Sequence, residues 1–295
     1  MKSKLAYVLF GIILLFGLWT TRVKSLDRET KNLIDQARTM DGADFFPGYD
    51  LENYPIDVSY GKIEFSYEKG KIFRQKSQCP PAFTAMKTGG GPRIKVLPLK
   101  DFRNIYDLGN KSKDSLNKAY IATLFHEGFH CFQMDHGLGQ GMEDLDGKNI
   151  ETKKDDKDLN EVLKRLDGDK VYQRLWIQEM KGLFILRDWG NSAAYRRARE
   201  ESLAYVEKKY KKRKFILYKD YINRMERIEG TARFVENSVL DAFKEERNGK
   251  FQGVYQKGQE KFYMSGALKT EIIEKKGRLK DIDFGLRGSL DDVME

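Results

Sequence analysis

Cysteine and histidine are both scarce in this chain. Its 295 residues contain two cysteines and three histidines. Cys79 and Cys131 could form one disulfide in an oxidising compartment, but two cysteines this far apart provide no disulfide framework. Because Cys131 directly follows His130, it would point about 100° away from that histidine on a helix. We therefore expect Cys131 to be a buried apolar residue.

The chain also lacks a nucleic-acid-binding motif and an internal repeat. Its net charge is +9, from 54 lysines and arginines against 45 acidic residues. The basic residues are scattered, and the densest basic run, residues 208–214, is short. A solvated helix face or attraction to an anionic envelope surface accounts for such a pattern. We therefore expect no nucleic-acid partner.

Long apolar runs are absent except at the N-terminus. Basic residues flank an apolar run from Leu5 to Trp19. This pattern is typical of a secretory signal or an uncleaved signal anchor. Neither a small-x-small cleavage site nor a cysteine for lipid attachment follows the run. We therefore predict that residues 1–25 anchor the protein in the cell membrane, with the remainder outside the cytoplasm. A cleaved signal peptide, giving a secreted protein, is the alternative.

Hydrophobic periodicity divides the remaining chain into two parts. Aromatic and β-branched residues alternate over residues 54–75, with Gly61 and Gly70 at turns, and a further strand is expected at 93–99. Later apolar residues recur at helical spacing. Helices are predicted at residues 26–40, 115–132, 171–188, 193–215, 219–246 and 257–275. The prediction is an α+β fold, with a small β-rich part (26–114) followed by a mainly helical part (115–295).

The most informative motif is His-Glu-Gly-Phe-His at residues 126–130. In an H-E-x-x-H motif on a helix, the two histidines share one face and can bind one zinc ion. Zinc acidifies a coordinated water, and Glu127 is placed to accept its proton during attack on a carbonyl. Apolar residues before the motif follow the i, i+3, i+4 pattern of a buried helix. The motif therefore predicts a zinc hydrolase, with peptide or protein substrates favoured.

A catalytic zinc needs a third protein ligand, and three residues are candidates. His136 reproduces the histidine spacing of metzincin peptidases, but those enzymes turn the chain at a glycine, where this chain has Gln133. A positive φ is costly at glutamine. Glu229 is the second candidate, because it flanks the apolar stripe of its predicted helix. Glu201 is the third, although no glycine follows it.

Three segments resemble gluzincin-type bacterial zinc peptidases. Residues 126–133 are similar to their H-E-x-x-H-x-x-Q motif, and residues 229–234 to their E-G-x-A-x-aromatic segment. Residues 262–268 resemble the tyrosine–glycine helix that follows. The resemblance covers roughly residues 115–290. It implies a zincin-like catalytic part in which His126, His130 and Glu229 bind zinc and Glu127 is the catalytic base.

Other positions near these motifs have weaker assignments. Gly230 costs about 1 kcal/mol relative to alanine in a helix, so its presence suggests a close approach to another helix or to the metal. Glu236 or Arg233 could orient a metal ligand. Tyr263 could donate a hydrogen bond to a tetrahedral oxyanion, or could pack in the core.

Two other functions remain open from the sequence. A non-hydrolytic envelope scaffold could have retained a zinc site, but a structural zinc prefers four protein ligands and has no use for Glu127. A zinc hydrolase could also act on an amide or ester of cell-wall material. The natural substrate, exo- or endopeptidase action and oligomeric state are not determined by sequence.

Overall fold

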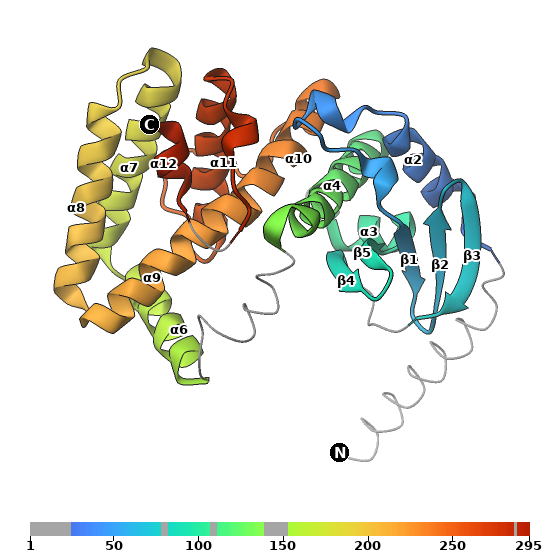
Figure 1. Cartoon of the computed structure of the whole chain (residues 1–295), viewed down its shortest axis with the longest axis horizontal. Helices are drawn as coiled ribbons and strands as arrows, with labels where there is room; N and C mark the ends of the chain where they lie inside the picture. The colour runs from blue at the N-terminus through green and yellow to red at the C-terminus, as the bar shows by residue number, and fades with distance from the viewer. Residues whose placement is uncertain (1–24, 78–81, 107–110, 139–152, 286–287) are drawn as a thin grey trace. The chain divides into compact units, whose positions relative to one another are not determined.

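The computed structural model describes residues 25–77, 82–106, 111–138, 153–285 and 288–295 (Figure 1). The chain forms two compact units. Unit 1 contains the residues up to Asp44 and Gly48–Cys131, and unit 2 contains Phe45–Pro47 and Phe132–Glu295. Unit 1 has a five-stranded mixed sheet and unit 2 is mostly helical, so the predicted α+β class is confirmed. The sequence placed the boundary between residues 114 and 115.

The sheet of unit 1 has the strand order β3-β2-β1-β5-β4. Its strands are β1 Ile56–Tyr60, β2 Ile63–Glu68, β3 Lys71–Lys76, β4 Thr84–Thr88 and β5 Gly91–Val96. β1 and β5 are parallel, and the other neighbours are antiparallel. Gly61 and Gly70, at the two predicted turns, have positive φ. The sequence did not predict β4.

Strand alternation separates an apolar face of the sheet from a polar one. The apolar face buries Ile56, Val58, Phe65, Ile94 and Val96. On the polar face, Lys95 pairs with Glu64 (2.8 Å), and Arg93 pairs with Asp57 (2.9 Å). The helices of unit 1 are α2 Arg28–Arg38, α3 Leu99–Tyr106 and α4 Lys113–Gln133, with short 3-10 turns η1 Gly42–Asp44 and η2 Leu51–Asn53.

Helix α4 carries the H-E-x-x-H motif and packs tightly in unit 1. The hydroxyl of Tyr49 donates to the carbonyl of Phe125 (3.1 Å). A Cβ atom on Gly128 would lie 2.4 Å from the Tyr49 hydroxyl oxygen and 2.5 Å from a methyl carbon of Leu51. The glycine inside the motif therefore permits this close packing. His126 and His130, two residues away on either side, point to roughly the opposite side of the helix.

Unit 2 is built from helices around a buried central helix, α11. Its elements are η3 Met134–Leu138, α6 Lys153–Asp167, α7 Lys170–Trp189, α8 Ala193–Lys209, α9 Lys212–Met225, η4 Glu226–Gly230, α10 Thr231–Ala242, α11 Glu260–Lys275, η5 Leu279–Asp281 and α12 Leu290–Met294. Helices α7 and α8 lie side by side (Figure 1), and a Cβ on Gly182 would lie 2.6 Å from the Tyr195 Cα. The segments η3 and η4 are π-helical.

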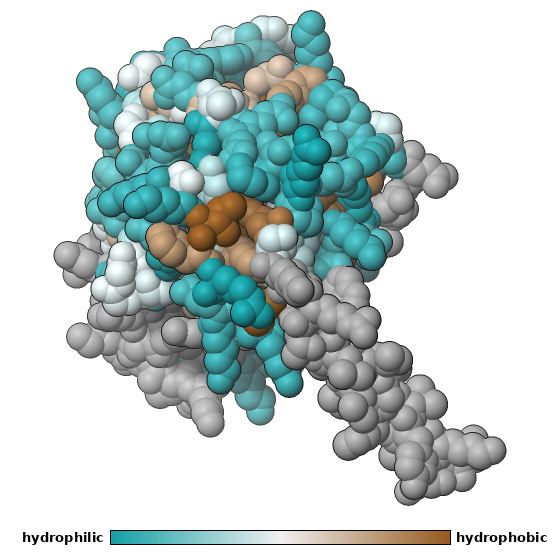
Figure 2. All heavy atoms as spheres, turned by 90° about the vertical axis from the view of Figure 1, so that its right-hand side faces the viewer, coloured by the Kyte–Doolittle hydropathy of each residue, from teal (hydrophilic) through white to brown (hydrophobic). Residues whose placement is uncertain are grey.

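The predicted membrane-tethered localisation requires correction. Within the described ranges, no helix combines the length and the apolar character needed to cross a bilayer. The 20-residue helix α7, for example, carries charged residues throughout its length. The apolar run from Leu5 to Trp19, on which the prediction depended, lies outside the described residues. Figure 2 shows a mostly hydrophilic face with a small hydrophobic group near its middle.

The two cysteines have different outcomes. Cys131 is fully buried in α4, as expected for a small apolar residue. Cys79 lies outside the described residues, so the disulfide that the two cysteines could form is not tested.

Candidate functional site

The imidazole rings of the two motif histidines lie with their Nε2 atoms close together. The Nε2 atoms of His126 and His130 are 3.2 Å apart, and the ring planes meet at 82°. With Zn–N distances of about 2.0–2.1 Å, tetrahedral coordination separates two nitrogen ligands by about 3.3 Å. The pair therefore fits two corners of a zinc site without a change of helix geometry. Glu127, on the same helix, is partly buried.

The last residue of α4 connects the motif helix to the segment that carries Glu229. Gln133 is fully buried, and its Nε2 donates to the carbonyl of Ile228 (2.9 Å) and to the hydroxyl oxygen of Thr231 (2.7 Å). These two acceptors flank Glu229 on either side. Sequence analysis recognised Gln133 only as part of a motif, because nothing in the local sequence identifies its distant acceptors.

One group of three residues in the described part of the chain could hold a metal ion. It consists of His126, His130 and Glu229, each offering one ligand atom within 4.8 Å of the others. Imidazole nitrogens and a carboxylate oxygen form a common donor set for catalytic zinc, which leaves a fourth position open. The donor types are compatible with zinc. The sequence predicted these three residues as zinc ligands, and this assignment stays a prediction.

The two other candidate ligands are not in this group. His136 is exposed, its Nδ1 lies 2.8 Å from the Phe132 carbonyl oxygen, and its ring packs on that of Phe132. The chain turns at Gly137, with φ of 117°, while Gln133 stays helical. The turn that metzincins make at the position of Gln133 is therefore absent. Glu201 is exposed on α8.

The segment η4 is held against α11 by contact between backbones. A Cβ on Gly230 would lie 2.4 Å from the Cα of Gly266, and a Cβ on Gly266 would lie 2.2 Å from the carbonyl oxygen of Glu226. Only glycine permits this approach at either position. The predicted close helix–helix approach at Gly230 is therefore confirmed.

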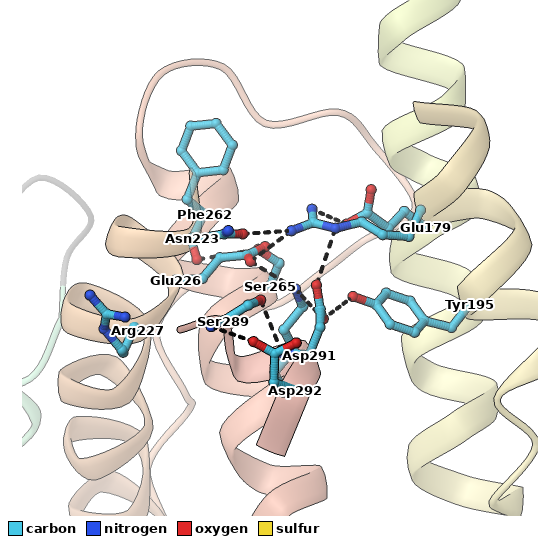
Figure 3. Close-up of polar contacts among 12 residues, drawn as sticks. Glu179, Tyr195, Asn223, Glu226, Arg227, Phe262, Ser265, Ser289, Asp291 and Asp292 are labelled. Carbon is cyan, nitrogen blue, oxygen red and sulfur yellow. Dashed lines mark hydrogen bonds and ion pairs between the residues drawn. The ribbon is translucent and has the colours of Figure 1, made fainter. Parts of the chain in front are cut away.

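A buried charge network also holds η4 in place (Figure 3). Its members come from five elements of unit 2: Glu179, Tyr195, Arg199, Glu226, Ser265, Lys269 and Asp291. Glu226, three residues before Glu229, pairs with Lys269 (2.7 Å) and Arg199 (3.2 Å) and accepts a hydrogen bond from Ser265 (2.7 Å). Sequence analysis missed this network because its members are dispersed over more than a hundred positions.

Two further residues with predicted roles lie in unit 2. Burial, followed by the negative charge of Glu229, raises the pKa of Tyr263, so its phenol stays protonated and can donate a hydrogen bond. Glu236 is buried, pairs with Arg233 (3.3 Å) and accepts from Asn248 (2.6 Å). Neither the oxyanion role of Tyr263 nor the ligand-orienting role of Glu236 is tested by these contacts, and both stay predictions.

Comparison with known proteins found no matching family model, no matching curated protein and no matching solved structure. The resemblance to gluzincin-type peptidases therefore depends on the motif residues and on their arrangement in this chain.

Proposed function

We propose that this protein is a zinc-dependent metallopeptidase of gluzincin type, with a zincin-like catalytic part. His126, His130 and Glu229 would hold the metal, and Glu127 would act as the catalytic base. The observation that carries the proposal is the 3.2 Å separation of the two Nε2 atoms, together with the grouping of Glu229 with them. When bound, zinc would act as a Lewis acid that lowers the pKa of water and polarises a peptide carbonyl.

The side chains of the chain would then divide the remaining tasks. The Glu127 carboxylate accepts a proton from water as the water attacks the peptide carbonyl, and passes it to the departing amine. The protonated Tyr263 phenol donates a hydrogen bond to the oxyanion that develops. Gln133 and the glycine contact at Gly230 position the segment that carries Glu229.

Replacement of Glu127 by glutamine tests the proposal. Purified wild-type protein and Glu127→Gln should each contain one zinc per chain by elemental mass spectrometry, because the metal ligands are intact. Only the wild type should cleave members of a broad peptide library. The rate of peptide hydrolysis by Glu127→Gln should be roughly 10²–10⁴-fold lower than that of the wild type, which is the usual contribution of a general base. Glu201→Gln, which changes an exposed glutamate, should retain both zinc and activity.

The outcomes separate the alternative functions. Full activity in Glu127→Gln would eliminate the mechanism, and wild-type protein without stoichiometric metal would eliminate the metallopeptidase. Zinc without turnover of any substrate would favour a non-hydrolytic binding protein. Turnover confined to amides or esters of cell-wall material would indicate a non-peptide hydrolase.

A further inference from the structure

Unit 2 contains a cavity of about 710 Å³ that combines apolar and cationic walls. Leu159, Leu203, Ile216 and Phe284 contribute apolar surface. Four cationic residues also line it: Arg199, Lys219, Arg224 and Arg227. The volume falls within the range of about 300–1,000 Å³ that is common for ligand sites.

Arg227 is a buried cation that forms no salt bridge with a carboxylate among the described residues. Only 5% of the residue is exposed. It donates one hydrogen bond, from Nη1 to the carbonyl oxygen of Gly288 (2.6 Å), and its Nε has no partner. In Figure 3 no dashed line joins Arg227 to the neighbouring network. Burial lowers the pKa of Arg227, and the negative charge of the more distant Asp283 offsets only part of this effect. A buried guanidinium without a direct ion pair is unfavourable, so an anion bound in the cavity would stabilise it.

Arg224 lies one helical turn before Arg227 and faces the same cavity. Within the described ranges its guanidinium forms no salt bridge, although Asp220 attracts it, and it lies 5.8 Å from the centroid of the Tyr221 ring. Two guanidiniums spaced by three residues on one wall can together bind a single anionic group.

The acidic residues of the cavity limit the charge of a suitable ligand. Asp291 is engaged by Lys269 (2.8 Å) and Arg199 (3.3 Å), and Asp292 accepts the backbone N–H of Ser289 (3.0 Å). Asp220 also lines the cavity. These carboxylates would repel a phosphate, which carries about −1.5 to −2 charges at pH 7, more than a monoanion. A carboxylate attached to an apolar group suits the cavity better.

We infer that this cavity binds a carboxylate of a peptide ligand, held by Arg227 and Arg224. The inference rests on the proposed peptidase function and specifies its substrate class. The ligand is a peptide with an acidic side chain or a free C-terminus beside an apolar side chain. Ile228 lines the cavity and directly precedes Glu229, so the cavity wall and the proposed metal ligand belong to the same segment, η4.

Calorimetric titration of full-length Glu127→Gln protein with matched peptides tests this inference. One pair is N-acetyl-Leu-Ala-Leu as the free acid and as the amide. The other pair is the amides of N-acetyl-Leu-Glu-Leu and N-acetyl-Leu-Gln-Leu. We expect the carboxylate member of at least one pair to bind on the order of tenfold more tightly than its neutral partner. The pair that responds shows whether the C-terminus or a side chain is bound.

Variants of Arg227 and Arg224 test whether the preference for carboxylate peptides over neutral ones arises in this cavity. In the Glu127→Gln background, Arg227→Gln should remove the preference, and Arg227→Lys should retain part of it because the charge remains. Arg174→Gln, an exposed arginine of α7, is the matched control and should keep the preference. Since removing an unpaired buried charge relieves a penalty, Arg227→Gln should melt no lower than its parent. If Arg227→Gln does not fold, Arg224→Gln provides the same comparison.

Three results would overturn the inference, and two of them concern the peptide pairs. One is equal binding of the charged and neutral members of both pairs, and the other is an unchanged preference in Arg227→Gln and Arg224→Gln. Tighter binding of inorganic phosphate than of acetate would overturn the carboxylate assignment. Zinc content and turnover are measured separately on wild-type protein. Turnover without a carboxylate preference would reject this inference alone, whereas a preference without zinc would reject the peptidase and leave a peptide-binding cavity.

Discussion

Single residues determine whether a metal can be held at the motif. His126 and His130 lie one turn apart on α4, so their proximity follows from helix geometry alone. Glu229 comes from a position 99 residues after His130, and it joins the group only through folding. A contribution of Glu229 to metal binding is therefore the decisive property to measure at this scale.

Glu229→Gln should lower zinc affinity because it replaces a charged ligand by a neutral amide. Loss of a group that only orients a ligand weakens binding by about 10–100-fold, so the loss of a direct ligand should be at least as large. Competition with a chromophoric chelator measures the affinity. Glu201→Gln is the control, and equal affinities of the two variants would exclude Glu229 as a ligand.

Between elements, backbone contact positions the segment that carries Glu229. Gly230 and Gly266 allow η4 and α11 to touch, and Gln133 ties the end of α4 to η4. The tendency of residues 219–246 to be helical is visible in their apolar spacing. The close contact between η4 and α11 cannot be recognised from this spacing, because a glycine within a helical sequence can have several causes.

Gly230→Ala should destabilise the protein by about 2 kcal/mol. Alanine favours a helix by about 1 kcal/mol over glycine, but overpacking typically costs 1–3 kcal/mol or more, and here the obstacle is backbone. The free energy of unfolding in urea measures the change. Gly89→Ala is the control, since a Cβ there would meet no atom within 4 Å. A more stable Gly230→Ala variant would contradict the close approach.

The N-terminus of α7 should show a pH-dependent contribution to stability. Asp169 caps the helix through the N–H groups of Val171 and Tyr172. Burial favours a higher pKa, but hydrogen bonds from Lys209 and Tyr205 outweigh it and lower the pKa from 3.8 to about 2. Because the pKa of Asp169 is lower in the folded than in the unfolded protein, its carboxylate stabilises the fold at any pH above the unfolded-state pKa. This contribution is lost as the pH falls through the folded-state pKa of about 2.

Asp169→Asn keeps a capping side chain but loses the ion pair. The variant should therefore be less stable than wild type at pH 7, and the difference should narrow as the pH falls below about 4. Urea unfolding at a series of pH values from 7 to 3 measures both free energies. A difference that is constant over this range would show that the carboxylate charge does not contribute.

At the scale of the whole molecule, the proposed ligands span positions 126 to 229 of the chain. An unfolded chain cannot hold ligands at this separation in one coordination sphere, so zinc should bind the folded protein preferentially. Ligand binding to the folded state alone raises stability by about 2.7 kcal/mol at a free concentration of 100 times Kd.

Added zinc should therefore raise the melting temperature of metal-free wild-type protein by several degrees. Differential scanning calorimetry after treatment with EDTA, and again after addition of zinc, measures this change. His130→Ala should show little response. A similar increase in that variant would indicate that zinc binds elsewhere.

The sequence by itself determined the features that depend on neighbouring residues. It predicted the α+β class, the strands β1 to β3 and β5, and the burial of Cys131, because strand and helix periodicities are local. The pairing of His126 and His130 was predictable for the same reason, since one helical turn separates them.

Tertiary structure decided what depends on residues distant in the chain. The acceptors of Gln133, the partners of Glu226 and the absence of a salt bridge to Arg227 within the described residues all follow from how the helices of unit 2 pack. A charged residue has the same identity in the sequence whether it is paired, solvated or buried alone. Only packing determines the burial and the neighbouring charges that distinguish these states.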